Sequence, residues 1–119
     1  MTDSSAAGGH LAVTVTHRDG VSVITVGGEI DHDSGDALRE ALALSTDTDK
    51  PRIVVDLSAV TFLDSSGINI LIHAHHRIRS GGGWLRLAAP TRPVLRTLQL
   101  VGLDQVIACH PTLDDALNT

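Results

Sequence analysis

The sequence predicts an α/β fold: one domain with a mixed, mainly parallel sheet of about five strands, packed by about four helices and opening with a β-hairpin. Three observations support this prediction. The chain has 119 residues, which is enough for one compact domain. Apolar patterns of strand type and helix type alternate along it. A strong hairpin signal precedes the first helical pattern.

The first predicted elements are two strands joined by a tight turn. Over residues 11–16 apolar residues alternate with Ala and Thr, which is the period-two pattern of a half-buried strand. Asp19-Gly20 is a typical hairpin turn pair. The apolar residues over 21–26 then predict the returning strand, and Gly27-Gly28 is expected to end it.

A helix and a buried strand follow the hairpin. Apolar residues recur at helical spacing over residues 37–42, and Asp33 or Ser34 is expected to cap this helix. A polar loop is predicted over residues 45–51. The continuous apolar run at 53–55 is typical of a strand covered on both faces.

The second half of the chain continues the alternation. A helical pattern over 68–79 is followed by Gly81-Gly82-Gly83, which suits the end of a helix. The remaining predicted elements are a strand over 84–87, a helix from Pro93 to Gly102, a strand over 106–108 and a helix over 113–117. Since strands alternate with helices, right-handed crossovers and a mainly parallel sheet are expected.

Composition limits the classes of function. The net charge is −5 with nine Lys and Arg residues, so the chain lacks the cationic surface of a nucleic-acid binder. No apolar run approaches the roughly 20 residues that span a bilayer, and no signal peptide is visible. The single cysteine, Cys109, closes no intramolecular disulfide and is expected to be a buried apolar side chain. We therefore expect a cytoplasmic protein with a flexible tail over 1–9 and one domain over 10–119.

The densest group of chemically informative residues lies at a predicted helix start. Asp64, Ser65, Ser66 and Gly67 follow a buried strand and fall in the first turn, where free amides and the helix dipole favour anions. A phosphate on Ser65 or Ser66 would meet a favourable field there and add about −1.5 to −2 charges beside Asp64. The same residues are also common helix caps, so local spacing alone leaves a purely structural role open.

These residues carry a resemblance to a known family. Asp56-Leu57-Ser58, followed by Phe62-Leu63-Asp64-Ser65-Ser66-Gly67, resembles the signature of the anti-sigma factor antagonists, which are built on the STAS domain. Gly28-Glu29-Ile30-Asp31 is similar to a second element of that family. The Gly-rich turn before Trp84, the segment 89–98 and Leu100-Val101-Gly102-Leu103 also follow the family pattern. The resemblance covers about residues 10–117. We therefore expect a STAS domain over residues 10–119.

The resemblance implies a switchable binding protein that is not an enzyme and needs no cofactor. Ser65 matches the family's phosphorylation site, and the kinase is the partner itself, an anti-sigma factor with serine kinase activity. The unphosphorylated protein binds this partner and frees a sigma factor; phosphorylation ends the binding, and a PP2C-type phosphatase reverses it. A monomer is expected. The implied partner-binding residues are Glu29, Asp31, Asp64, Ser65, Ser66 and Gly67. Asn69 departs from the small residue usual in the first helical turn, which leaves the identity of the partner open.

Three alternatives compete with this interpretation. The chain could be an unphosphorylated STAS scaffold subunit of a lipid-transport or stressosome-like assembly. His73 and His76 have a spacing that can share a metal ion, but no acidic residue lies in their helix, so no metal site is expected. Ser65, a histidine and Asp31 supply the residue types of a hydrolase, but the G-x-S-x-G motif of the nucleophile elbow is missing.

Overall fold

The computed structural model describes residues 11–118, so the tail predicted over 1–9 lies outside the described residues. The elements are β1 (Leu11–Arg18), β2 (Val21–Ile30), α1 (Asp36–Thr46), β3 (Arg52–Leu63), α2 (Ser65–Ser80), β4 (Trp84–Ala88), α3 (Arg92–Leu100), the 3-10 turn η2 (Leu103–Gln105), β5 (Ala108–His110) and α4 (Leu113–Asn118). Their order is the one that the sequence predicts.

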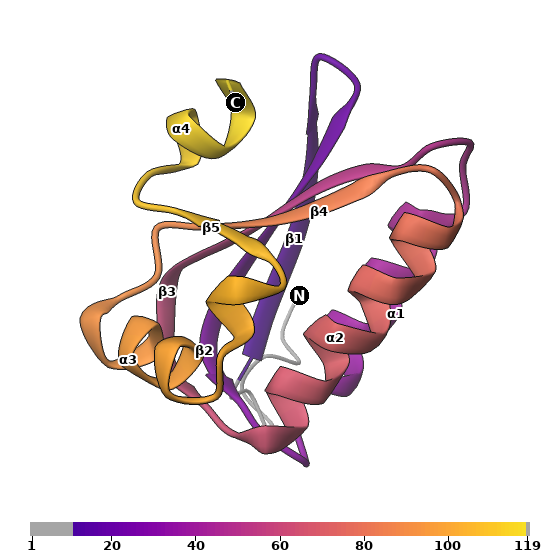
Figure 1. The fold of residues 1–119 in the computed structure, drawn as a ribbon. Coiled ribbons are helices and arrows are strands. Elements are labelled where there is room, and N and C mark those ends of the chain that lie inside the picture. Colours follow the sequence, from indigo (N-terminus) through magenta and orange to yellow (C-terminus); the bar gives the residue numbers. More distant parts are fainter. Residues whose placement is uncertain (1–10, 119) are drawn as a thin grey trace.

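The strands form one sheet in the order β1-β2-β3-β4-β5. The β1–β2 pair is antiparallel, and the other pairs are parallel. In Figure 1, α1 and α2 run side by side along one face of the sheet. Val94 and Leu98 of α3 belong to the same core cluster as these two helices, whereas α4 packs through Ala116 in a separate cluster with Val54. The predicted mixed, mainly parallel sheet with an opening hairpin is confirmed.

The core is almost entirely aliphatic, as expected for a chain with one Phe, one Trp and no Tyr. Its largest cluster joins β2, β3 and β4 to the two long helices, and includes the fully buried Ile24, Ile53, Leu57, Leu71 and Ile78. A smaller cluster beneath α4 contains Val21, Val54, Ala88 and Ala116. Each element therefore buries one apolar face against the sheet, and the ends of the strands remain free to carry polar residues.

Strands β1 to β4 are all longer than predicted, and β2 and β3 exceed their predicted ends the most. β2 continues through Gly27-Gly28 to Ile30, and β3 continues past the run 53–55 to Leu63. The pairing between them shifts register between Thr25 and Gly27 and again between Gly28 and Glu29. The glycines therefore accommodate irregular pairing inside the sheet instead of ending the strand. As a result, Ile30 and Leu63 are register partners at the carboxyl end of the sheet.

The predicted position of the last strand is also wrong. β5 covers Ala108–His110 instead of 106–108, because Val106 follows the turn η2 and is 51% exposed. Ile107 is buried in the main cluster, so the apolar run fills the core before the strand begins. The short β5 then pairs with the end of β4.

The first helix differs from its prediction at both ends. α1 runs to Thr46, two residues into the predicted loop. Its N-cap is Gly35, with no side-chain cap, so the expected capping by Asp33 or Ser34 is wrong. Ser34 is instead used inside the preceding loop, as described below. α2 begins at Ser65, three residues before the pattern that predicted it.

Candidate functional site

The site lies where β3 passes into α2. The backbone N–H of Asp64 donates to the Ile30 carbonyl oxygen at 3.2 Å, which continues the β2–β3 pairing to the last residue before the helix. Asp64 is the N-cap of α2: its Oδ1 accepts from the backbone N–H groups of Ser66 at 2.9 Å and Gly67 at 3.2 Å. The capping role expected of Asp64 is therefore present, and it fixes the direction in which the first turn leaves the sheet.

Ser65 is the first residue of α2 and is exposed. Asp64 and Ser66 on either side of it are half-buried. The Ser65 side chain therefore lies at the solvent-facing tip of a 16-residue helix, where the positive end of the helix dipole is found. A hydroxyl at this place is accessible to a second protein, and its neighbour Asp64 already supplies a negative charge.

Gly67 brings the helix close to the end of β2. A Cβ atom on Gly67 would lie 2.9 Å from Ile30 Cγ2 and 3.3 Å from the Ile30 carbonyl oxygen, and it would also overlap Leu63 Cδ1. A side chain at this position would have to displace Leu63 and Ile30. Gly67 is the buried member of the predicted partner-binding residues. It contributes to the site by allowing α2 to pack against β2, and not by contacting a partner.

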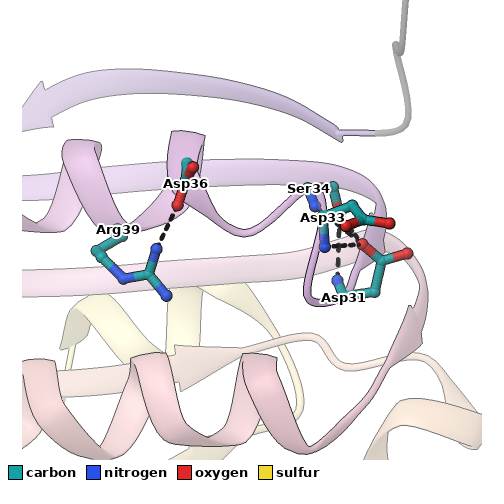
Figure 2. A network of polar contacts seen from close by, with 5 residues as sticks. All are labelled: Asp31, Asp33, Ser34, Asp36 and Arg39. Carbon is teal, nitrogen blue, oxygen red and sulfur yellow. Dashed lines mark hydrogen bonds and ion pairs between the residues drawn. The ribbon is translucent and has the colours of Figure 1, made fainter.

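The loop between β2 and α1 is organised by Asp31 and Ser34. Asp31 Oδ1 accepts from the backbone N–H of Asp33 at 3.0 Å and of Ser34 at 2.9 Å (Figure 2). The Ser34 hydroxyl lies 2.7 Å from both the Glu29 carbonyl oxygen and Asp31 Oδ1, and it accepts from the Asp31 N–H at 3.1 Å. Asp31 therefore holds the loop in shape. The sequence reasoning missed Ser34 in this role, although the Asp31-x-x-Ser34 spacing is typical of such a turn.

Glu29 and Phe62 are register partners on neighbouring strands, and both are exposed. Phe62, the single Phe of the chain, is 47% exposed three residues before Ser65. Sequence reasoning quoted Phe62 within the motif but did not assign it to the site. Large exposed apolar side chains at the centre of a polar surface are typical of protein-binding sites.

The histidines of α2 are distributed away from Ser65. His73 and His76 are both exposed, and His73 lies eight residues, or about 12 Å of helix rise, beyond Ser65. Within residues 11–118, no group of three or more His, Cys, Asp and Glu side chains is placed to hold a metal ion. The helix thus does not bring His73 to the serine, as a Ser-His hydrolase would require.

Cys109 differs from its prediction, because it is half-buried and not fully buried. It packs against the edge of the main core cluster. Burial, and to a smaller extent the nearby Asp104 carboxylate, raise the pKa of the Cys109 thiol. The thiol form is therefore favoured.

In the described part of the chain, no helix is both long and apolar enough to cross a bilayer.

Comparison with known proteins agrees with this architecture. The model of the STAS domain family matches residues 12–116. Anti-sigma-F factor antagonist RsfB of Mycobacterium tuberculosis is 38% identical over 109 residues, covering 90% of this chain and 87% of the relative. Anti-sigma-F factor antagonist RsfA of the same organism is 31% identical over 112 residues, covering 91% of this chain and 86% of the relative.

A solved structure leads to the same family. The crystal structure of an anti-sigma factor antagonist from Mycobacterium paratuberculosis superimposes with a TM-score of 0.80 at 39% identity, covering 90% of this chain and 91% of that one. The family model spans nearly all of the described residues, and both relatives align over most of their own length. The chain belongs to the STAS domain family.

Proposed function

We propose that this protein is a cytoplasmic anti-sigma factor antagonist. It binds an anti-sigma factor that is also a serine kinase, and phosphorylation of Ser65 by that kinase ends the binding. The names of the relatives support the general role, and their partner, an anti-sigma-F factor, suggests the class of partner here. The observation that carries the proposal is the exposed Ser65 at the start of α2, next to the capping carboxylate of Asp64.

The docking surface is defined here as Glu29, Asp31, Asp64, Ser65, Ser66 and Gly67, to which we add Phe62. Its members take different parts. Ser65, Glu29 and Phe62 are exposed and available for direct contact. Asp31 and Gly67 shape the surface indirectly. Asp31 orders the loop between β2 and α1, and Gly67 lets the first turn of α2 pack closely against Ile30.

Electrostatics explains how one phosphate would act as a switch. Phosphorylation adds about −1.5 to −2 charges to a surface that already carries Glu29 and Asp64. Two unit charges about 4 Å apart near a protein surface interact with about 4 kcal/mol. A partner surface that fits the neutral serine would meet both this charge and the added volume. The fold itself need not change, because Ser65 is exposed and the helix dipole favours an anion at this position.

The proposal is tested by incubating the protein with an anti-sigma factor kinase and ATP, followed by mass spectrometry of the peptides. We expect one phosphate, on Ser65. Ser66→Ala is the matched control, because it changes a neighbouring hydroxyl and should still accept the phosphate. The site assignment fails if Ser65→Ala incorporates phosphate stoichiometrically.

Binding is measured separately with the same kinase. The unphosphorylated protein should form a complex, the phosphorylated protein should bind at least about tenfold more weakly, and a PP2C-type phosphatase should restore binding. Ser65→Ala should bind whether or not ATP is present. Equal binding of the two forms would instead favour a constitutive scaffold.

A further inference from the structure

The end of the sheet opposite to Ser65 holds a cluster of arginine side chains. Arg18 ends β1, Arg52 begins β3, and Arg86 lies near the start of β4; all three line one cavity of about 500 Å³. β3 spans 12 residues between Arg52 and Leu63, so the cavity lies on the order of 30 Å from the docking surface. Three of the nine Lys and Arg residues gather here, in a chain whose net charge is −5.

Trp84 forms part of the wall of this cavity. It is the register partner of Arg52, and Arg86 lies two residues further along the same strand, so all three side chains project to one face of the sheet. The Arg86 guanidinium stacks over the Trp84 ring, with Cζ 3.6 Å from the ring centroid. Arg86 Nη1 also donates to the Ala116 carbonyl oxygen at 2.8 Å, which fixes this guanidinium beneath α4.

The Arg52 side chain lies beside the hairpin turn. Its guanidinium lies so close to Gly20 that a Cβ atom there would overlap Nη2. Within residues 11–118, no carboxylate lies within ion-pair distance of the three arginines of the cavity. The ion pair found among these residues joins Arg39 and Asp36, which lie on α1. The carboxylates of Asp19 and Asp114 also line the cavity, and they reduce its positive charge without pairing with the guanidiniums.

We propose that this cavity, the arginine cavity, binds a small phosphate ester. Guanidinium groups match the oxygens of a phosphate in a fork geometry, and three of them from separate strands can surround a dianion. The cavity is larger than a bare phosphate ion requires. Trp84, Val21 and Leu117 provide an apolar wall beside the guanidiniums for the organic part of the ligand. This inference is independent of the function proposed for Ser65.

The test uses the full chain and the single Trp as a probe. Phenyl phosphate and inorganic phosphate are each titrated in phosphate-free buffer, with NaCl holding the ionic strength constant, while Trp84 fluorescence is followed. Phenyl phosphate should give a saturable change. Arg52→Ala should weaken its binding at least about tenfold, and Asp114→Asn should strengthen it, because a nearby negative charge is removed. Arg96→Ala, an exposed arginine on α3, is the matched control and should bind as the parent does.

Phosphorus NMR of the ligand provides a second measurement that does not depend on Trp84. Far-UV circular dichroism and thermal unfolding confirm that each variant is folded. The proposal is overturned if phenyl phosphate produces only the change that NaCl produces, or if Arg52→Ala binds it as tightly as the parent. Equal affinity for inorganic phosphate and phenyl phosphate would overturn the assignment to an ester, since the apolar wall would then contribute nothing.

Discussion

Gly67 in the first turn of α2 lies directly against Ile30 at the end of β2. The position of a Cβ atom on Gly67 is 2.9 Å from Ile30 Cγ2, and the Ile30 carbonyl oxygen accepts the backbone N–H of Asp64 at 3.2 Å. The start of α2 is therefore held to β2 by one close contact and one hydrogen bond. This arrangement brings the first turn of α2, which carries Ser65, to the end of β2, although the two segments are far apart in the sequence.

Gly67→Ala should destabilise the protein by about 1–3 kcal/mol, because the added methyl group overpacks against Ile30 and Leu63. Urea unfolding measures the loss. Asn69→Ala, an exposed position two residues along the same helix, is the control and should change the free energy of unfolding by no more than about 0.5 kcal/mol. Equal stability of Gly67→Ala and the parent would show that α2 can move away from β2 freely.

Asp64→Ala should lower the free energy of unfolding by about 1 kcal/mol, because the amides of Ser66 and Gly67 lose their acceptor. Asp64→Asn is the matched variant. It removes the charge but keeps a side-chain oxygen that can accept both hydrogen bonds, so it should retain most of the stability. If both variants were equally unstable, charge and not capping would be the stabilising factor.

The sequence was most informative where local chemistry decides the structure. Asp19 and Gly20 both adopt positive φ, 52° and 82°, as the predicted tight hairpin turn requires. Asp64 to Gly67 are contiguous, so the capping residue, the exposed hydroxyl and the glycine were visible together. Each of these features depends on residues within one turn of each other.

Features that depend on distant partners were not predictable in the same way. β3 includes the polar residues Asp56 and Ser58, which interrupt the apolar pattern that predicts a strand. The strand continues there because it pairs with β2. The exposure of Phe62 likewise follows from the register of that pairing. The closeness of Gly67 and Ile30 exists only once the sheet and α2 have assembled, and a single sequence contains no periodicity that reports it.

Two glycines at the end of α2 offer a test of close packing. A Cβ atom on Gly83 would overlap the Pro51 carbonyl oxygen, whereas one on Gly81 would make ordinary contacts of 3.6 Å or more. Gly83→Ala should therefore destabilise the fold by about 2 kcal/mol or more, because backbone atoms have to move. Gly81→Ala should stay within about 1 kcal/mol of the parent. Thermal unfolding of the two variants compares them directly, and the opposite order would contradict the packing seen at Pro51.

His75 should make stability depend on pH. Burial lowers the pKa of His75, and the positive charges of His76 and Arg79 lower it further; Arg86 of β4 lines the same hollow. In the unfolded chain the group returns to its ordinary value of about 6.5. Below that value the unfolded chain binds the proton more readily than the folded protein does. The contribution of His75 to stability is therefore complete above about pH 6.5 and is lost as the pH falls toward the lowered pKa.

Urea unfolding at a series of pH values between about 8 and 5 measures this effect. The His75→Gln variant cannot take up the proton, so its free energy of unfolding should fall less on acidification than that of the parent. His73→Gln, an exposed histidine on the same helix, is the control and should follow the parent curve more closely. Parallel curves for His75→Gln and the parent would mean that protonation of His75 is not coupled to folding. The decrease would then have to come from other groups.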